Sequence, residues 1–215
     1  MSTMRTAESI LFTPKKIGKV EVKNRFVHSA TNESMASLTG EATDDLVKRY
    51  WKLAKGEVGL IIPGYMYVHP YGKAQTYQTG IYSDRMVQGL RRLVETIHEG
   101  GSKVFFQLAH SGSQTTRGIL GRTPMGPSDT RRDPVYLFRP IRMTEEDIAV
   151  VVRAFGEAAR RTAEAGADGV QLHAAHGYLI SQFLSPFLND RDDAWGGTDE
   201  NRFRFLKEVF LEVRR

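Results

Sequence analysis

The sequence of 215 residues contains no cysteine. This absence excludes disulfides, a thiolate nucleophile, cysteine-bound zinc and cysteine-held iron–sulfur clusters. Any redox chemistry would therefore depend on a bound cofactor. The chain also lacks an apolar run near the roughly 18 residues that span a membrane, and residues 1–9 lack the hydrophobic core of a signal peptide. We therefore expect a cytoplasmic protein with no membrane partner.

The chain has little excess of either charge. Its formal net charge is +5, and most basic residues of the predicted helices lie among acidic neighbours. Nucleic-acid binding calls for a continuous basic stripe or a recognisable module, so we predict no nucleic-acid partner. One denser group of arginines lies in a connection rich in glycine and proline: Arg117, Arg122, Arg131, Arg132, Arg139 and Arg142. Two interpretations of this group stay open, contact with an anionic substrate and plain solvation of a loop.

Hydrophobic residues make up 40% of the chain, which is a globular composition. Their pattern predicts four units, each a strand followed by a helix. The predicted strands are residues 25–30, 58–62, 103–108 and 169–172. The predicted helices are residues 44–55, 83–99, 144–163 and 201–215. The last helix carries one predicted apolar stripe, formed by Phe203, Leu206, Phe210 and Val213.

Strands that alternate with helices predict an α/β fold with a parallel sheet and right-handed crossovers. The order is consistent with a TIM (β/α)8 barrel, but a full barrel takes roughly 250 residues. We therefore expect residues 1–215 to form a single partial barrel with about the first four β/α units. Residues 11–22, with Gly18 between two short apolar runs, predict a hairpin that plugs the lower end. The connection 111–143 exceeds the usual two to six residues, which predicts a lid or substrate loop.

Polar side chains follow the last predicted strand. His173, His176 and Tyr178 lie within six residues, directly after residues 169–172. In parallel α/β folds, ligands bind at the carboxyl ends of the strands. Two imidazoles can donate hydrogen bonds to one substrate oxygen, and a nearby phenol can deliver a proton. We interpret the group as a candidate catalytic site; the alternative is a structural histidine among ordinary loop residues.

A series of short motifs runs in one order along nearly the whole chain. The motifs are Leu11–Pro14, Lys23–Val27, Gly59–Ile62, Gly101–Val104, Gln107–His110, His173–Leu179, Phe183–Pro186, Trp195–Gly197 and Asn201–Phe205. In this order they resemble the Old Yellow Enzyme family of FMN-dependent ene-reductases and NADH:flavin oxidoreductases. The resemblance implies an FMN-binding TIM barrel that holds the flavin at the carboxyl ends of its strands. It also implies NADH or NADPH as the reductant.

The resemblance further implies roles for individual residues. It places flavin contacts at Ser29, Ala30, Thr31, Asn32, Tyr65 and Gln107. A carboxamide such as Gln107 offers both a donor and an acceptor to the imide edge of a flavin; the alternative is a buried polar residue that is satisfied by the backbone. The resemblance implies that His173 and His176 bind the electron-withdrawing oxygen of a small α,β-unsaturated substrate. It implies that Tyr178 protonates the carbon next to that group, after hydride transfer through the flavin to the activated C=C bond.

The family's later strands, which supply the phosphate site of FMN, have no matching segment in this sequence. One alternative is therefore a catalytically incomplete half barrel, which forms a homodimer or joins a missing C-terminal half through exposed edges at residues 25–30 and 169–172. We expect a monomer to leave several inner-facing side chains uncovered, among Phe26, His28, Ile61, Phe105, Gln107 and Gln171. Another alternative is a hydrolase in which His173 and His176 bind a metal, although the resemblance predicts no metal.

Overall fold

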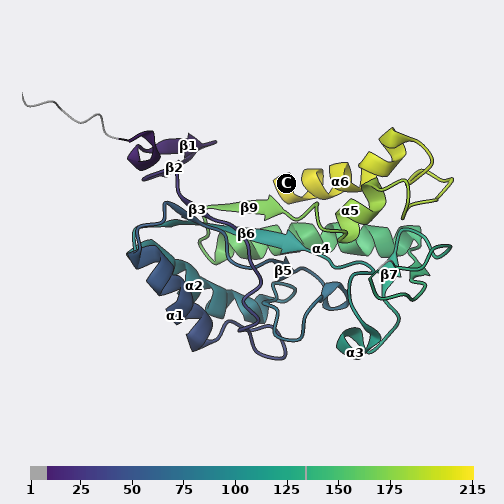
Figure 1. The fold of residues 1–215 in the computed structure, drawn as a ribbon, viewed down its shortest axis with the longest axis horizontal. Helices are drawn as coiled ribbons and strands as arrows, with labels where there is room; N and C mark the ends of the chain where they lie inside the picture. Colours follow the sequence, from purple (N-terminus) through teal and green to yellow (C-terminus); the bar gives the residue numbers. More distant parts are fainter. Residues whose placement is uncertain (1–8, 134) are drawn as a thin grey trace, which may run out of the picture.

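The computed structural model describes residues 9–133 and 135–215. Residues 1–8, for which the sequence predicts no signal peptide, lie outside the described part. Figure 1 shows a central sheet with helices along one side and a separate small hairpin near the N-terminal end. Among the described helices, none is long and apolar enough to cross a membrane.

Four parallel strands form the sheet predicted from the sequence, and a fifth short strand extends it. The strands are β3 (Val27–His28), β4 (Leu60–Ile61), β5 (Met66–Tyr67), β6 (Lys103–Ala109) and β9 (Gly169–Leu172). β3 pairs with β4, β4 pairs with the start of β6, and β5 pairs with its end. β9 pairs with the opposite side of β6. β3 and β9 are therefore the two edges of the sheet, as expected.

The first two strands are shorter than the predicted residues 25–30 and 58–62. Pro63 follows β4 and has no N–H to donate to a neighbouring strand. The chain therefore leaves the sheet after Ile61 and joins β6 again at Met66. This interruption divides the second strand of the barrel into β4 and β5, and the apolar pattern gives no signal for β5.

Each strand unit is followed by a long helix, as predicted. The helices are α1 (Asp44–Lys55), α2 (Val87–Glu99), α4 (Glu145–Glu164) and α6 (Asp199–Arg214). α1, α4 and α6 begin at a threonine whose side chain accepts a backbone N–H, and at α4 Thr144 and Asp147 form a capping box. α2 follows a short 3-10 turn, η3 (Asp84–Met86), and Ser83, the first residue of the predicted helix, precedes that turn without a capping bond.

The residues of β6 alternate between two faces of the sheet. Val104, Phe106 and Leu108 are fully buried in a core shared with α1, α2 and α4. Phe105 and Gln107 lie between them in sequence and are only partly buried, because successive side chains of a strand point to opposite faces. α1, α2 and α4 cover the first face (Figure 1), and the second face is the inside of the barrel.

The predicted set of uncovered inner-face residues is correct only in part. Phe26 and Gln171 are exposed, as expected. Ile61 is fully buried in the helix-side core, because it lies opposite Val104 in the sheet. His28 packs edge-on against Tyr50 of α1, with 5.9 Å between the ring centroids, so it also faces the helices.

The N-terminal hairpin closes one end of the inner face. β1 (Lys15–Ile17) and β2 (Val20–Val22) pair antiparallel, as predicted, and follow a short 3-10 turn, η1 (Ile10–Phe12). The turn uses Gly18 at φ 59°, a left-handed conformation that glycine adopts without strain. Val22 packs with Leu60 and Ile62 in a small second core. The hairpin therefore covers the amino-end side of the inner face, where the sequence predicts a plug.

The connection 111–143 contains secondary structure of its own, namely α3 (Arg117–Leu120), β7 (Met125–Gly126) and β8 (Ile141–Arg142). A second 3-10 turn, η2 (Pro70–Gly72), lies earlier in the chain, between β5 and η3. β7 and β8 pair with each other in parallel. The buried Arg191 joins the carboxyl ends of the two strands, since its guanidinium donates to the carbonyls of Pro127 and Met143 at 2.8 Å each. The connection is therefore tied to the segment that follows the last described strand.

α6 buries the predicted stripe only in part. Leu206 and Val213 are partly buried and pack against the core, as predicted. Phe205 and Val209 are fully buried, whereas Phe203 and Phe210 are 49% and 51% exposed. Phe205 stacks on Phe183 of the short helix α5 (Leu179–Leu184), with ring centroids 4.3 Å apart. α5, which the sequence does not predict, thus decides which side of α6 turns inward.

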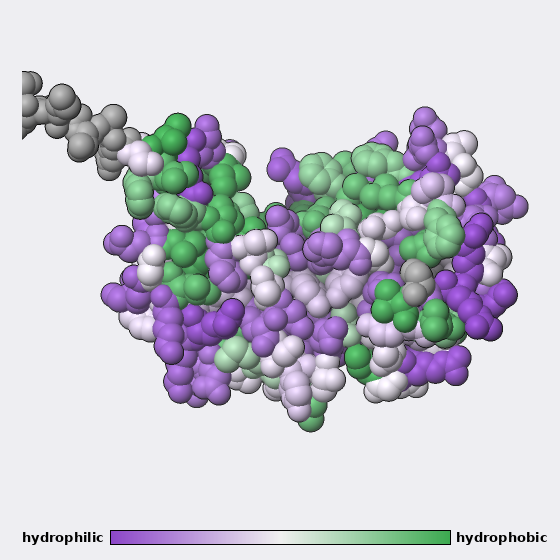
Figure 2. Space-filling model, viewed as in Figure 1, coloured by the Kyte–Doolittle hydropathy of each residue, from purple (hydrophilic) through white to green (hydrophobic). Residues whose placement is uncertain are grey.

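Exposed apolar side chains gather near both edges of the sheet. Near β3 they include Phe12, Phe26 and Val27, and on α6 they include Phe210 and Leu211. Figure 2 shows these regions in green on the two sides of a hollow, with the hairpin on one side and α6 on the other. Monomeric soluble proteins seldom expose large contiguous apolar patches, so both edges are candidate contact surfaces.

Candidate active site

The polar residues after β9 form a tight turn at the carboxyl end of the sheet. The backbone N–H of His173 continues the ladder to Leu108 at 2.9 Å, and the N–H of Leu179 donates to the carbonyl of His110 at 2.9 Å. Between these anchors, His176 and Gly177 adopt left-handed conformations, with φ 57° and 73°. Such a conformation is strained for a histidine and occurs often at functional sites.

This turn gathers the three predicted catalytic residues. The ring of His173 stacks on that of Tyr178 with 4.7 Å between centroids, and meets the ring of His176 edge-on at 5.2 Å. His173 is buried, Tyr178 is partly buried and His176 is exposed. Tyr65, a predicted flavin contact, joins the group at 5.6 Å from His173 and 5.3 Å from Tyr178. We call these four residues the imidazole–tyrosine cluster.

Burial sets the protonation of this cluster. It lowers the pKa of His173 to about 4, with a smaller contribution from His176. His173 is therefore neutral at pH 7, and its Nδ1 accepts the backbone N–H of Ala175 at 3.3 Å. The proton of the neutral ring must then lie on Nε2, which makes this nitrogen a donor. Burial also raises the pKa of Tyr178, so its phenol keeps its proton.

The predicted flavin loop after β3 is more open. Ser29 and Thr31 are exposed, while Ala30 and Asn32 are partly buried. Asn32 donates to the hydroxyl of Ser34 at 3.1 Å, and the Thr31 hydroxyl donates to the carbonyl of Ser29 at 3.3 Å. Their polar groups thus bond within the loop, at the carboxyl end of an edge strand.

Glu33 connects this loop to the imidazole–tyrosine cluster. Its Oε1 accepts the backbone N–H of Gly64 at 2.7 Å, and a Cβ at Gly64 would clash with its carboxylate. The Glu33 carboxylate thus fills the space that a side chain at position 64 would take, directly before Tyr65. Burial raises the pKa of Glu33. The sequence gives no signal for Glu33, because only its contact with Gly64, 31 positions away, reveals its role.

Gln107 lies on the inner face, opposite Gln171 of β9. Its Nε2 donates to Oε1 of Gln171 at 2.6 Å, and the two residues are in register in the parallel pair. Gln107 is two residues before the end of β6, so it lies one inner-face position deeper than the turn that carries His173. Gln171 is a second residue that was not predicted as part of the site. Its predicted place on the inner face was the signal that could have identified it.

The connection 111–143 also reaches the cluster. Tyr136 lies close enough to Tyr65 and Tyr178 that its phenol disfavours their ionisation. Gln182, fully buried on α5, donates to the carbonyls of Ser111 and Gly177 at 3.0 and 2.6 Å. This amide fixes the start of the connection to the turn that carries the histidines.

The alternative in which His173 and His176 bind a metal lacks a third ligand. Within residues 9–133 and 135–215, no group of three histidine, cysteine, aspartate or glutamate side chains converges as a metal site. Zinc in catalytic sites takes three protein ligands. The described geometry therefore gives this alternative no support.

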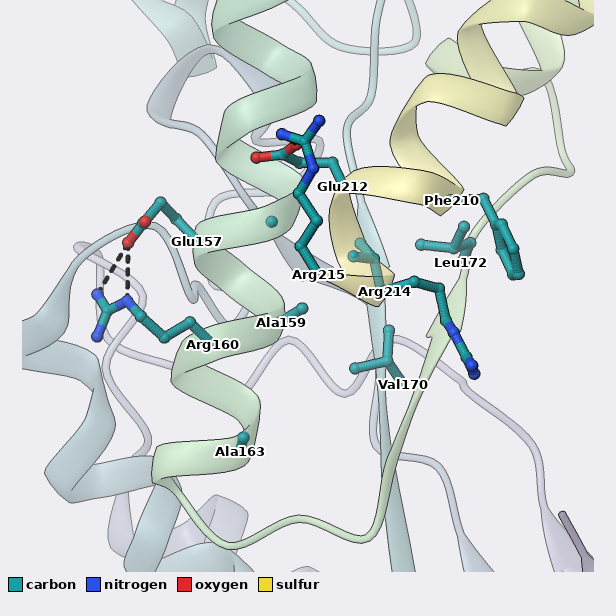
Figure 3. Close-up of a pocket in the computed structure, with 12 residues that line it drawn as sticks. Glu157, Ala159, Arg160, Ala163, Val170, Leu172, Phe210, Glu212, Arg214 and Arg215 are labelled. Carbon is teal, nitrogen blue, oxygen red and sulfur yellow. Dashed lines mark hydrogen bonds and ion pairs between the residues drawn. The ribbon is translucent and has the colours of Figure 1, made fainter. Parts of the chain in front are cut away.

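The inner-face side chains fit the ring of a flavin. The carboxamides of Gln107 and Gln171 remain partly or fully exposed beside the cluster, and together they present the donors and acceptors that an imide edge needs. A larger cavity lies elsewhere, beside the free edge of β9. It has a volume of about 940 Å³ between α4, β9 and the end of α6, and Figure 3 shows Val170 and Leu172 of β9 facing it together with Phe210 of α6.

Comparison with known proteins agrees with this geometry. Residues 10–215 match the NADH:flavin oxidoreductase / NADH oxidase family. The chain is 40% identical to an NADPH dehydrogenase of Bacillus subtilis over 206 residues, which cover 95% of this chain and 60% of that protein. An NADPH dehydrogenase of a Geobacillus species is 39% identical over 214 residues, which cover 96% of this chain and 60% of that protein.

Solved structures show the same relationship. The Old Yellow Enzyme of a Pichia species superimposes with a TM-score of 0.89 at 32% identity, over 96% of this chain and 56% of that one. A 2-naphthoyl-CoA reductase superimposes with a TM-score of 0.91 at 32% identity, over 95% of this chain and 33% of that one. These neighbours are TIM barrels, so the four described units are part of such a barrel.

The chain therefore spans about 60% of the length of the curated relatives that it matches. Members of the matched family use FMN together with NADH or NADPH. The parallel order of β3, β4, β6 and β9 and the histidine turn after β9 agree with the match over residues 10–215. The chain belongs to the NADH:flavin oxidoreductase / NADH oxidase family.

Proposed function

We propose that this chain is part of an FMN-dependent oxidoreductase. In this proposal, hydride passes from NADH or NADPH by way of the flavin to the activated C=C bond of a small α,β-unsaturated carbonyl or related compound. The observation that carries the proposal is the imidazole–tyrosine cluster, which places two imidazoles and a protonated phenol beside the inner-face amides. Membership of the family supports it.

His173 and His176 bind the substrate oxygen in this scheme. The neutral ring of His173 offers Nε2–H as a donor, and His176 is exposed at the same turn. Negative charge grows on that oxygen as the C=C bond is reduced. Donors that are already fixed in place stabilise such charge by a few kcal/mol, because no reorganisation is needed during the reaction (about 3 kcal/mol for one donor).

Tyr178 supplies the proton to the carbon next to the activating group. Its raised pKa keeps the phenol protonated at neutral pH, and its stacking on His173 holds it beside the bound oxygen. A positioned acid of this kind contributes to the rate only when it is within hydrogen-bond reach of the carbon that it protonates. Tyr65 packs edge-on against the phenol and restricts its position.

Six residues are proposed to hold the flavin ring: Ser29, Ala30, Thr31, Asn32, Tyr65 and Gln107. When bound, FMN supplies the hydride-carrying redox centre that the cysteine-free chain does not have. Gln107 orients the ring through its carboxamide, and the loop after β3 offers exposed hydroxyls and backbone groups.

An absorbance titration tests this proposal. Added FMN should show a saturable shift of its visible bands in the presence of the chain, and the shift should weaken when Gln107 is replaced by Leu. Riboflavin should bind within about threefold of FMN if the ring contacts dominate, which is a difference below ~1 kcal/mol. Unchanged flavin spectra at saturating protein would contradict the proposal.

We propose that residues 1–215 act as one domain and that residues 111–143 form a substrate loop over the cluster. Tyr136 supports the second part, because it lies near Tyr65 and Tyr178. The cytoplasmic location predicted from the sequence stays a prediction. Limited proteolysis with and without flavin tests the loop, since bound ligand should slow cleavage between residues 129 and 140.

We propose that two copies of the isolated chain associate through the edges of their sheets. β3 and β9 each have one unpaired side in the described chain, and exposed apolar residues lie beside both of them. Unpaired strand edges favour pairing with another chain. Size-exclusion chromatography with light scattering should give a dimer, and a monodisperse monomer that retains stoichiometric FMN would contradict this proposal.

A further inference from the structure

A second cavity, of about 140 Å³, lies outside the proposed flavin and substrate sites. It is enclosed by the segment around η2, the end of β6, β7 and the first turns of α4. None of its lining residues belongs to the imidazole–tyrosine cluster or to the predicted flavin contacts. Its polar groups are His69, His110, Arg122, Tyr71 and Asp147.

His110 presents an unpaired donor to this cavity. The residue is 4% exposed, and its Nδ1 accepts the backbone N–H of Gly112 at 3.1 Å. Burial lowers the pKa of His110 to about 3, so the ring is neutral and its proton lies on Nε2. Nε2 makes no hydrogen bond to the described residues, and it is not among their fully enclosed unpaired atoms. It therefore faces accessible space, where an unpaired donor favours a ligand.

His69 repeats this arrangement beside it. Its Nδ1 accepts the backbone N–H of Tyr71 at 3.3 Å, and burial, with a smaller contribution from Arg122, lowers its pKa. The neutral ring again carries its proton on Nε2. The rings of His69 and His110 are stacked, with 6.3 Å between centroids and 24° between planes. Two N–H donors thus line one wall.

Arg122 supplies the positive charge. Its guanidinium lies 4.4 Å from the centre of the Tyr71 ring and forms no ion pair with the described residues. The acidic residue of the lining, Asp147, is engaged elsewhere, because its Oδ2 accepts the N–H and the hydroxyl of Thr144 at 2.9 and 2.8 Å. The remaining walls are apolar, from Met125, Met143, Val150 and Val151.

We propose that this cavity binds a small oxyanion, a carboxylate or a phosphate group, on Arg122 and the two imidazole donors. A guanidinium pairs with either group through two parallel N–H bonds. A water molecule takes about 30 Å³ of liquid volume, so the cavity has room for an anion of about five heavy atoms. Two imidazoles and no converging third ligand among the described residues do not suit a metal.

The proposed site also gives a role to one arginine, Arg122, of the dense group in the connection 111–143. Arg122 is partly buried and faces the cavity, whereas Arg117 of the same group is exposed. The pair thus offers a matched comparison within one loop. Loss of Arg122 removes the positive charge of the site, and loss of Arg117 removes an equal charge from the loop without touching the cavity.

Histidine signals in NMR spectra of the full chain test the proposal, because the sequence has only six histidines. Sodium acetate and sodium phosphate are titrated separately, with sodium chloride at matched ionic strength. We expect saturable shifts of the His69 and His110 signals, assigned with His69→Gln, and an affinity on the order of millimolar. Saturation by acetate alone assigns the site to carboxylates, and saturation by phosphate alone assigns it to phosphate groups.

Arg122→Ala should weaken binding at least tenfold, and Arg117→Ala should leave it unchanged. If Arg122→Ala does not fold, Arg122→Lys keeps the charge but loses the paired N–H bonds, and it should weaken binding severalfold. The proposal is overturned if chloride produces the same shifts, if neither anion saturates, or if the Arg117 and Arg122 variants bind equally well.

Discussion

The two halves of the candidate site differ in how firmly the described chain holds them. In the imidazole–tyrosine cluster, His173 is buried, the turn is anchored at both ends by backbone bonds, and Gln182 fixes it from below. In the flavin half, the loop after β3 is largely exposed, and Gln107 bonds only to the exposed Gln171. One half is built into the core and the other faces an open space.

This difference follows from where each half finds its neighbours. The cluster packs against β5, β6 and α5, which are all present in the described chain. The flavin half lies on the inner face of the sheet, and the chain covers about 60% of the length of its relatives. Four barrel units are therefore enough to hold the candidate catalytic side chains in place, whereas a flavin on the inner face, as proposed, would find fewer neighbours in the described chain.

The largest effect on the reaction rate is expected at Tyr178, the proposed proton donor in the imidazole–tyrosine cluster. Tyr178→Phe removes the proton donor and leaves the flavin ring contacts, so reduction of FMN by NADPH should stay within about twofold. Reoxidation by an activated alkene should fall about 100-fold or more, which is the usual contribution of a positioned general acid. Stopped-flow absorbance of the two half-reactions measures both rates.

Tyr77→Phe is the matched control, because Tyr77 is 49% exposed and lies outside the cluster. It should leave both half-reactions unchanged. Equal losses of both half-reactions in Tyr178→Phe would show that the phenol has a structural role. The imidazole–tyrosine cluster would then not differ from the flavin half by carrying the proton donor.

The long helices and the barrel order were predictable because they depend on local signals. α1 ends and begins at the predicted residues, since Thr43 caps it and its apolar residues repeat at helical spacing. The capping box at Thr144 likewise identifies α4. The strands β3 and β4 are shorter than predicted, because pairing partners and Pro63, rather than apolar character, decide where a ladder stops.

The grouping of His173, His176 and Tyr178 was predictable because they lie within six positions of one another after a strand. Glu33, Gln171 and Tyr136 were not, because each depends on contacts between distant segments. Half of the predicted stripe on α6 is exposed for a related reason, while Leu206 and Val213 pack against the core. Phe203 and Phe210 have the right spacing, but the packing of Phe205 on α5 turns them outward. Spacing identifies a helix face, and the neighbours decide whether that face is buried.

A second prediction compares the same substitution in the two halves. Gln182→Leu leaves the carbonyls of Ser111 and Gly177 without their donor, so the free energy of unfolding should fall by about 3 kcal/mol. Gln107→Leu removes one exposed hydrogen bond and should cost less than about 1 kcal/mol. Urea denaturation followed by circular dichroism measures both, and equal losses would show that the inner face is as firmly held as the cluster.

A third prediction concerns pH. The pKa of His173 is about 4 in the folded chain and 6.5 as its ordinary value. Between these values the unfolded chain binds a proton that the folded chain does not, so stability falls as the pH falls from 6.5 to 4. His173→Asn should remove about 2 kcal/mol of this fall. His110 and His69, whose pKa values burial also lowers, contribute to the part that remains.

The control for this experiment is His176→Asn, because His176 is exposed at the same turn. Denaturation at pH 7 and at pH 4.5 should give nearly the same loss for this variant as for the unchanged chain, because His176 makes only the smaller contribution to the low pKa of His173. If the free energy of unfolding of His173→Asn keeps the full pH dependence, the ring of His173 is not held neutral by its surroundings. The imidazole–tyrosine cluster is then more open to water than the burial of His173 indicates.

The smallest expected effect belongs to Glu33, which joins the two halves. Burial raises its pKa above 4.5, so between 4.5 and the raised value the folded chain holds a proton that the unfolded chain has lost. The free energy of unfolding therefore falls as the pH rises through this window.

Glu33→Gln stays neutral and keeps an oxygen that accepts the Gly64 N–H. It should therefore abolish this fall in the free energy of unfolding, which we expect to be less than about 1 kcal/mol. Glu95→Gln on the exposed face of α2 is the control and should keep it. Denaturation at pH 4.5 and pH 8 measures the difference, and identical pH profiles for the unchanged chain and Glu33→Gln would mean that this carboxylate does not link the flavin loop to Gly64 through a buried bond.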